Sequence, residues 1–241
     1  RKESSAASDV YKRQALDCPV YKIASFEITD IPLIEYAASK HKPMVLATGI
    51  ATEEDIQLAV EACRRMGNND ITVLKCTSSY PAPVEEANLC MIRDLAERFQ
   101  VKSGLSDHTL GSVSPIVAVT QGASMIEKHF ILNRSIGGPD CSFSMEEKDF
   151  AQMVKDVRMA ELSLGKMTYE LTEKMRGSRS ASRSLYVAED MKAGEVITER
   201  NVRSVRPGFG LHPKYLKDIL GKNVNRDLEK GTRFALEYVN G

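Results

Sequence analysis

The sequence predicts an α/β fold made of parallel βαβ units, followed by a smaller β-rich module. Two observations lead to this prediction. From residue 21 to residue 164, short apolar runs alternate with amphipathic stretches, and each pair occupies roughly 25–30 residues. After residue 184 the helical periodicity ends, and short strand-like pieces alternate with glycine-containing turns. The two parts of the chain therefore have different architectures.

Five strands are predicted in the first part. Each is a short apolar or β-branched run between turn residues, which is the pattern of a parallel strand buried on both faces. A helical stretch follows each strand, and this alternation predicts parallel pairing. The predicted strands are Tyr21–Ser25, Met44–Thr48, Ile71–Cys76, Lys102–Ser106 and Met125–Phe130.

Five helices are predicted between and after these strands. Asp30 is a suitable N-cap for the first helix, and Thr52, followed by three acidic residues, is a strong start for the second. Glycine follows several of the predicted C-termini, where its left-handed conformation ends a helix. The predicted helices are Ile31–Ser39, Thr52–Met66, Val84–Phe99, Ser112–Gln121 and Glu146–Leu164.

Two architectures are compatible with five βα units. A closed (β/α)₈ barrel needs eight units and about 250 residues, so an intact barrel would lack three units at its front. A doubly wound open sheet can be built from five units. However, no glycine-rich dinucleotide-binding turn follows the first strand, which disfavours a nucleotide-binding version of that sheet.

Composition divides the chain into four segments. Residues 1–14 are polar, small and aperiodic, and are predicted to be a disordered or foreign leader. Residues 15–167 carry the βα units, and the Arg- and Ser-rich residues 168–182 are predicted to be a linker. Residues 183–241 form the β module, with strand-like pieces at 185–188, 195–197 and 234–236. Because a buried-strand pattern follows the leader directly, we predict that the chain is a fragment without its natural N-terminal sequence.

Composition also excludes several classes of partner. The chain has 33 basic and 33 acidic residues, so charge gives no reason to expect nucleic acid or an anionic membrane surface as partner. No apolar run reaches the roughly 18–20 residues of a membrane span, and no signal-peptide pattern opens the chain. The five cysteines show no CxxC spacing, which favours a reducing, cytoplasmic compartment.

Two histidines stand at the carboxyl ends of neighbouring predicted strands, where reactive groups of βα folds lie. His108 follows the fourth strand and His129 ends the fifth. Neighbouring strands lie about 4.8 Å apart, so the two imidazoles could share one metal ion. An open shell completed by water or substrate oxygens suits Mn²⁺ or Mg²⁺ better than structural Zn²⁺. The alternative is that each histidine is an ordinary, hydrogen-bonded polar residue.

Hydroxyl groups and one lysine occupy the other strand ends. Such a cluster suits a phosphate or carboxylate group, although serine and threonine after strands are also common helix caps and turn formers. Cys76 lacks a sequence feature that would activate its thiol, and is therefore assigned to the core. The cluster consists of Lys22, Ser25, Thr48, Thr77, Ser78 and Ser106.

Several segments together resemble the sialic acid synthase family. At the strand ends these are YKIASFE (21–27), TGI (48–50), KCTSSYP (75–81), GLSDHT (104–109) and EKHF (127–130). RSLYVA (183–188) and SVRPGFGL (204–211) are similar to that family's antifreeze-like (SAF) domain. The resemblance runs from about residue 16 to the C-terminus. It implies a partial TIM (β/α)₈-type barrel, comprising about its last five βα units, followed by a small β-clip SAF domain.

The resemblance implies an enzyme. Members of the family condense phosphoenolpyruvate with an open-chain acylamino sugar and water, and release phosphate. KIASFE (22–27) and GPDCSFS (138–144) are most similar to pseudaminic acid synthases, whose sugar is 2,4-diacetamido-2,4,6-trideoxy-L-altrose. Synthesis of N-acetylneuraminate or legionaminate is the alternative within the family. The metal is expected to be Mn²⁺, with Mg²⁺ or Co²⁺ as alternatives.

The resemblance also implies roles for individual residues. A domain-swapped homodimer is expected, in which the SAF domain covers the partner's sugar site. The family carries Asn where Ser78 stands and Ser where Ala47 stands, so this chain departs from the family at those two positions. Carried over by motif, His108 and His129 bind the metal, and Lys22, Ser25, Ser78 and Ser106 bind phosphoenolpyruvate. Glu27, Tyr80 and Asp140 are expected to be catalytic residues that face the sugar, and Arg206 of the SAF domain is expected to cover the partner's sugar site. Thr48, from the hydroxyl cluster, is also expected to bind substrate.

Two other classes of function compete with this interpretation. One is a different barrel enzyme of the phosphoenolpyruvate-condensing or aldolase type, against which the SAF-like segment argues. The other is a degenerate, non-catalytic interaction or carbohydrate-binding protein. Because three βα units of the family's barrel are absent, we expect the isolated chain to be poorly soluble or inactive, even where the parent protein is an active enzyme.

Overall fold

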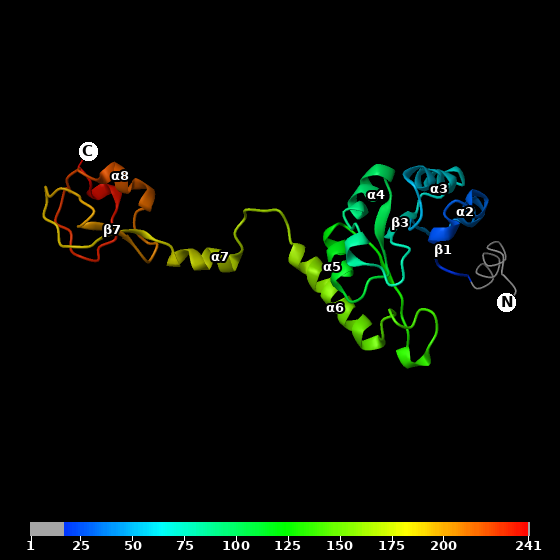
Figure 1. The fold of residues 1–241 in the computed structure, drawn as a ribbon. Helices are drawn as coiled ribbons and strands as arrows, with labels where there is room; N and C mark the ends of the chain where they lie inside the picture. The colour runs from blue at the N-terminus through cyan, green and yellow to red at the C-terminus, as the bar shows by residue number, and fades with distance from the viewer. Residues whose placement is uncertain (1–16, 241) are drawn as a thin grey trace. The chain divides into compact units, whose positions relative to one another are not determined.

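The structure is a computed structural model that describes residues 17–240, and the leader predicted at residues 1–14 lies outside this range. The chain forms two compact units, one ending at Lys166 and the other beginning at Met167. Figure 1 follows the chain through both units.

The first unit contains a parallel sheet of five strands, paired in the order of the chain. This order has no reversal, whereas a doubly wound sheet reverses direction at a switch point, so the sheet follows the progression of a barrel. All five predicted strands are present. They are β1 (Tyr21–Ile23), β2 (Met44–Ala47), β3 (Ile71–Cys76), β4 (Lys102–Asp107) and β5 (Ile126–Lys128).

The sheet is strongly curved, and one contact demonstrates it. Lys22 Nζ on β1 lies 2.5 Å from Glu127 Oε1 on β5, although three strands separate them. In a flat sheet, four strand spacings would hold the two strands about 19 Å apart. The sheet therefore curls toward itself like the wall of a barrel, which confirms the predicted fold class.

Helices follow the strands and cover one face of the sheet (Figure 1). The predicted cap of the second helix is confirmed: Thr52 Oγ1 accepts a hydrogen bond from Asp55 N, and Asp55 Oδ2 accepts one from Thr52 N. Asp30 caps the first helix by accepting from Leu33 N. The helices are α2 (Ile31–Ala38), α3 (Glu53–Arg65), α4 (Met91–Phe99), α5 (Val113–Thr120) and α6 (Glu147–Leu164).

The prediction of one continuous helix over residues 84–99 is wrong. A short 3₁₀ helix, η2 (Val84–Glu86), comes first, and α4 begins only at Met91. Between them Asn88 has a φ of 45°, in the left-handed region that interrupts a right-handed helix. The spacing of apolar residues does not reveal this break, because those residues keep helical spacing on both sides of it. Asparagine is one of the few residues that readily adopt the left-handed conformation found here.

The core of the first unit lies between the sheet and its helices. Alternate strand residues point toward α2, α3 and α4, and pack there with Ile34, Val60 and Leu95. The intervening residues project from the opposite face. Because registered partners in a parallel sheet project on the same side, Cys76, Ser106 and Glu127 share that opposite face. The strand residues of the core are Tyr21, Ile23, Met44, Leu46, Ile71 and Val73.

The second unit is a small β module with helical turns. Strands β6 (Ser184–Val187) and β7 (Val202–Val205) pair antiparallel, and isolated bridges such as Met191 with Leu228 extend the structure. A strand was predicted at residues 234–236, but residue 236 begins the 3₁₀ helix η6 (Leu236–Tyr238). Other helices of the unit are α7 (Glu173–Ser178) and α8 (Leu216–Ile219). Its core contains Leu185, Met191, Ile197, Val202, Ile219, Val224 and Phe234.

Within residues 17–240, no helix combines the length and the apolar character needed to cross a membrane.

The five cysteines are free thiols with different surroundings. Burial raises the pKa of the Cys63 thiol to about 11, whereas Cys90 is exposed. Because the thiolate is the reactive form, we expect iodoacetamide at pH 8 to alkylate Cys90 at least about a hundredfold faster than Cys63 in the native protein. Mass spectrometry of quenched samples measures both rates. Denaturation is expected to remove the difference, and a difference that persists in denaturant would contradict burial as its cause.

Candidate active site

Side chains from β1, β4 and β5 meet where the curved sheet brings the strand ends together. Glu127 Oε1 lies 2.5 Å from Lys22 Nζ and accepts a hydrogen bond of 2.9 Å from Ser106 Oγ. Lys22 and Ser106 were predicted site residues, and the structure places both against the same carboxylate. This carboxylate therefore joins a lysine on the first strand to a serine on the fourth.

The two predicted metal ligands also lie close together. The ring centroids of His108 and His129 are 5.1 Å apart. His108 is buried, and its Nδ1 lies 2.9 Å from the carbonyl oxygen of Thr77. A carbonyl can only accept a hydrogen bond, so Nδ1 carries the proton and Nε2 remains available to a ligand.

The second histidine is half-buried and has an acidic neighbour. His129 Nδ1 lies 3.8 Å from Asp140 Oδ2. Burial lowers the pKa of His129, and the nearby His108 lowers it further. The structure thus favours the neutral imidazole at His129, which is the form that binds metal ions.

Aromatic rings surround the histidine pair. The ring centroid of Tyr80 lies 4.3 Å from that of His108, and the ring centroid of Phe143 lies 4.9 Å from that of His129. Tyr80, a predicted sugar-facing residue, is therefore next to the predicted metal ligands. A tyrosine hydroxyl is protonated at neutral pH and can donate a hydrogen bond, and partial burial raises the pKa of Tyr80 further above its ordinary value.

A cradle of small polar groups lies at the ends of β1, β2 and β3. Gly49 N donates a hydrogen bond of 3.1 Å to Ser25 Oγ. The hydroxyl of Ser78 is buried and has no hydrogen-bond partner within the part of the chain that the structure describes. A Cβ atom at Gly49 would stand 2.0 Å from Ser78 Oγ and 2.8 Å from Ser25 Oγ. A small anionic ligand bound at this position would supply the hydrogen bond that the buried hydroxyl lacks.

Not every predicted residue joins these groups. Thr48 Oγ1 donates to the carbonyl of Leu74, which ties β2 to β3. Glu27 is half-buried in the 3₁₀ helix η1 (Ser25–Glu27), two residues after Ser25. Arg206 belongs to the second unit, where it is exposed immediately after β7.

Sequence reasoning missed two residues of this site. Glu127 stands two positions before His129, which directly follows β5, so alternation along the extended chain places both side chains on the same face of the sheet. Cys76 was assigned to the core, and it is buried, but its Sγ accepts a hydrogen bond from Ser25 Oγ (3.4 Å) and lies 3.9 Å from His108 Nδ1. No local sequence signal places this thiol beside the histidine, because the contact spans 32 residues.

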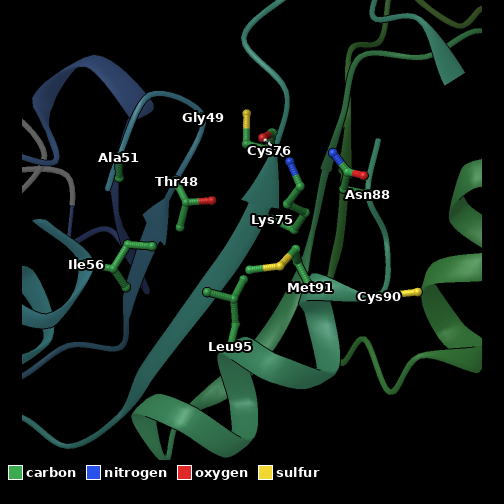
Figure 2. Close-up of a pocket in the computed structure, with 10 residues that line it drawn as sticks. All are labelled: Thr48, Gly49, Ala51, Ile56, Lys75, Cys76, Asn88, Cys90, Met91 and Leu95. Carbon is green, nitrogen blue, oxygen red and sulfur yellow. Dashed lines mark hydrogen bonds between the residues drawn. The ribbon is translucent and has the colours of Figure 1, made fainter. Parts of the chain in front are cut away.

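A separate pocket of about 380 Å³ opens next to the cradle (Figure 2). Thr48, Gly49 and Cys76 border it on the side of the strand ends, and Met91 and Leu95 border it on the side of α4. Lys75 extends into the same region and donates a hydrogen bond to the carbonyl of Cys76. The pocket is therefore adjacent to the cradle but lined largely by helix-side residues.

The curved parallel sheet, the paired histidines and the hydroxyl cradle at its carboxyl edge define a (β/α)-barrel protein with a candidate active site at the strand ends. Residues 5–169 match the NeuB family, and residues 182–233 match the SAF domain. The chain belongs to the NeuB family. This result confirms the predicted family and the predicted C-terminal SAF domain.

Two curated relatives are pseudaminic acid synthases. The chain is 50% identical to that of Helicobacter pylori over 227 residues, which cover 94% of the chain and 67% of the relative. It is 45% identical to that of Campylobacter jejuni (strain 81-176) over 226 residues, which cover 94% of the chain and 66% of the relative. The chain thus spans about two thirds of the length of these relatives.

Solved structures agree with the fold. The spore coat polysaccharide biosynthesis protein SpsE of Bacillus subtilis aligns with a TM-score of 0.64 and 30% identity, over 99% of this chain and 72% of that one. A putative spore coat polysaccharide biosynthesis protein E of Chromobacterium violaceum aligns with a TM-score of 0.71 and 26% identity, over the same shares of the two chains.

Proposed function

We propose that the protein is a pseudaminic acid synthase, which condenses phosphoenolpyruvate with 2,4-diacetamido-2,4,6-trideoxy-L-altrose and water and releases phosphate. The observation that carries this proposal is the 45–50% identity to pseudaminic acid synthases over 94% of the chain. Identity to the N,N'-diacetyllegionaminic acid synthases of Legionella pneumophila and Campylobacter jejuni is 33% and 31%. The choice of sugar follows from this difference.

The proposal includes an organisation of the chain. Residues 15–167 contribute the barrel part, residues 168–182 the linker and residues 183–241 the SAF domain. A domain-swapped homodimer would bring Arg206 to the sugar site of the partner subunit, where its guanidinium could bind the hydroxyl or carboxylate oxygens of the ligands. Phosphoenolpyruvate is the second substrate, and the protein would act in the cytoplasm.

Enzymes of this family are generally metal-dependent. The residues of this chain fit a metal ion, because two imidazoles lie side by side and Thr77 fixes the tautomer of His108. No group of three or more His, Cys, Asp or Glu is placed to hold a metal in residues 17–240. His108 and His129 would therefore hold Mn²⁺ with water and substrate as the other ligands. When bound, such an ion supplies Lewis-acid polarisation of the sugar aldehyde.

The cradle would hold the phosphate of phosphoenolpyruvate. Ser25 and Ser78 offer hydroxyls, and the second of these has no other partner in the described chain. Lys22 offers an ammonium group, which makes the strongest kind of hydrogen bond to an anion. Glu127 fixes the position of that ammonium, and Ser106 contacts the same carboxylate. Lys22 thus reaches the substrate from a preorganised position.

Three residues would face the sugar. Asp140 lies near His129 and would orient its ring while binding a sugar hydroxyl or amide. Tyr80 would donate its phenolic hydrogen from above His108. Glu27 follows the strand that carries Lys22, and would accept hydrogen bonds from sugar hydroxyls.

The test uses a chimaera in which residues 17–241 replace the corresponding part of the Helicobacter pylori relative. Phosphate release is measured with phosphoenolpyruvate, Mn²⁺ and one of three sugars: the diacetamido-trideoxyaltrose, the legionaminate precursor or N-acetylmannosamine. We expect kcat/KM to be at least about tenfold higher for the first sugar, since a site with buried polar groups rejects ligands that leave them unpaired. The unmodified relative is the control, and turnover of N-acetylmannosamine alone would overturn the choice of sugar.

A further inference from the structure

A second pair of charged side chains lies behind the histidines, on the helix-facing side of the sheet. Lys128 Nζ lies 2.6 Å from Asp107 Oδ2, and the two side chains are 2% and 1% exposed. Lys128 also donates to the carbonyl of Thr109 at 2.6 Å, and Asp107 Oδ1 accepts from Thr109 N at 2.9 Å. This is a fully buried ion pair whose two members share a third residue.

The pair stands in direct register with the candidate metal ligands. Asp107 on β4 and Lys128 on β5 are cross-strand partners. His108 follows Asp107 in the chain, and His129 follows Lys128. Leu105 and Ile126 belong to the cluster that packs on the helix-facing side, and strand alternation places Asp107 and Lys128 on that side with them. Each histidine is the first residue after its strand, and the same alternation directs its side chain to the opposite face.

Stability alone is a weak explanation for such a pair. Desolvation of two buried charges offsets most of their attraction, and well-packed apolar residues of similar size are often as stable. The pair also constrains the structure. It holds β4 and β5 in register at the residues that immediately precede His108 and His129. Its bonds to Thr109 also hold the chain immediately after His108, and Thr109 Oγ1 in turn donates to Ser114 Oγ of α5.

We propose that the buried Asp107–Lys128 pair is a positioning device for the two histidines and sets the separation of their metal-binding nitrogens. The inference rests on the metal site of the proposed function. A shared ion requires both nitrogens about 2.1 Å from one point, and productive geometry tolerates errors of about 0.5 Å. Any slip of β4 along β5 would move one imidazole relative to the other by the same distance.

The test replaces both charges at once, because a single replacement leaves an unpaired buried charge. Asp107→Leu/Lys128→Met keeps the volume, while Lys128→Arg keeps the charge. Mn²⁺ affinity is measured by electron paramagnetic resonance of the free ion, in the chimaera described above. We expect the double variant to bind Mn²⁺ about 10–100-fold more weakly, as for other groups that orient metal ligands, and Lys128→Arg to bind within about threefold of the parent.

A second measurement examines the histidine rings of the same variants in the absence of metal. Long-range ¹⁵N–¹H spectra of the imidazole rings report the tautomer of each histidine. We expect His108 to change from one tautomer to a mixture in the double variant, because a displaced ring loses its bond to the carbonyl of Thr77. The control is Asp70→Asn/Lys102→Met, which removes an exposed ion pair (2.9 Å) at the opposite end of β4. It is expected to change neither measurement. Circular dichroism and thermal melting verify that each variant is folded.

The outcomes separate this inference from the proposed function. Parent-like Mn²⁺ affinity and unchanged ring spectra in a folded double variant would overturn the positioning role and leave the metal site intact. Failure of the parent to bind Mn²⁺ would instead contradict the proposed metal site. In that case the ring spectra still decide the structural part: unaltered His108 and His129 signals in the double variant would refute the pair's control over the rings.

Discussion

Replacing His108 by alanine is expected to lower the affinity for Mn²⁺ by more than the roughly 10–100-fold that loss of a supporting group causes. The reason is the small number of protein ligands. The structure brings only two imidazoles together, and no further His, Cys, Asp or Glu in residues 17–240 completes a cluster of three. Removing one imidazole therefore removes half of the donors that residues 17–240 place at the site. The same result is expected for His129→Ala.

The measurement is a titration of Mn²⁺ followed by the resonance of the free ion, with melting curves recorded on the same samples. His212→Ala is the matched control, because His212 lies in the second unit, where its ring accepts a hydrogen bond from Lys214 N. Parent-like affinity in both His108→Ala and His129→Ala would exclude these residues as ligands. A loss in only one of them would point to a site with a single protein imidazole.

Replacing Gly49 by alanine is expected to weaken phosphoenolpyruvate binding about hundredfold. The added Cβ would stand 2.0 Å from Ser78 Oγ, 2.8 Å from Ser25 Oγ and 3.2 Å from Cys76 Sγ. These are the ends of side chains, so the fold can adapt, but both hydroxyls of the cradle must turn away. Two lost hydrogen bonds to an anion, at about 1.5 kcal/mol each, correspond to about a hundredfold in Kd.

Calorimetric titration of the chimaera with phosphoenolpyruvate in the presence of Mn²⁺ measures this effect. Gly177→Ala is the control, because within residues 17–240 the added Cβ meets nothing within 4 Å apart from the adjacent residues and the backbone of its own helix, α7. A cradle that tolerates Gly49→Ala with parent-like affinity would not be the phosphate site. Because Gly49 does not have a positive φ, the substitution tests space rather than backbone strain.

Periodicity and turn residues were sufficient to predict the strands and most of the helices. Both signals are local. The apolar residues of a buried strand lie within the strand itself, and Thr52 caps α3 through Asp55, three residues farther along the chain. The helix predicted over residues 84–99 failed for the same reason, since the left-handed Asn88 lies within an otherwise helical pattern. Local sequence cannot distinguish such an asparagine from one in a helix.

The residues of the candidate site also differ in whether local sequence signals predict their contacts. Strand ends and alternation were enough to bring His108 and His129 together, because neighbouring strands need no knowledge of the whole sheet. The contact between Lys22 and Glu127 was not predictable in this way. It depends on the curvature accumulated over five strands, and no spacing in the sequence reports curvature.

The same contact has a consequence for the kinetics of folding. Lys22 and Glu127 are 105 residues apart, so their meeting closes a far longer loop than any pairing of successive strands. The edge strand β1, only three residues long, must dock before that loop closes. The polar centre of the unit would then be completed late, after the local βα pairs have formed. A ligand bound there would mainly retard unfolding and leave the folding rate almost unchanged.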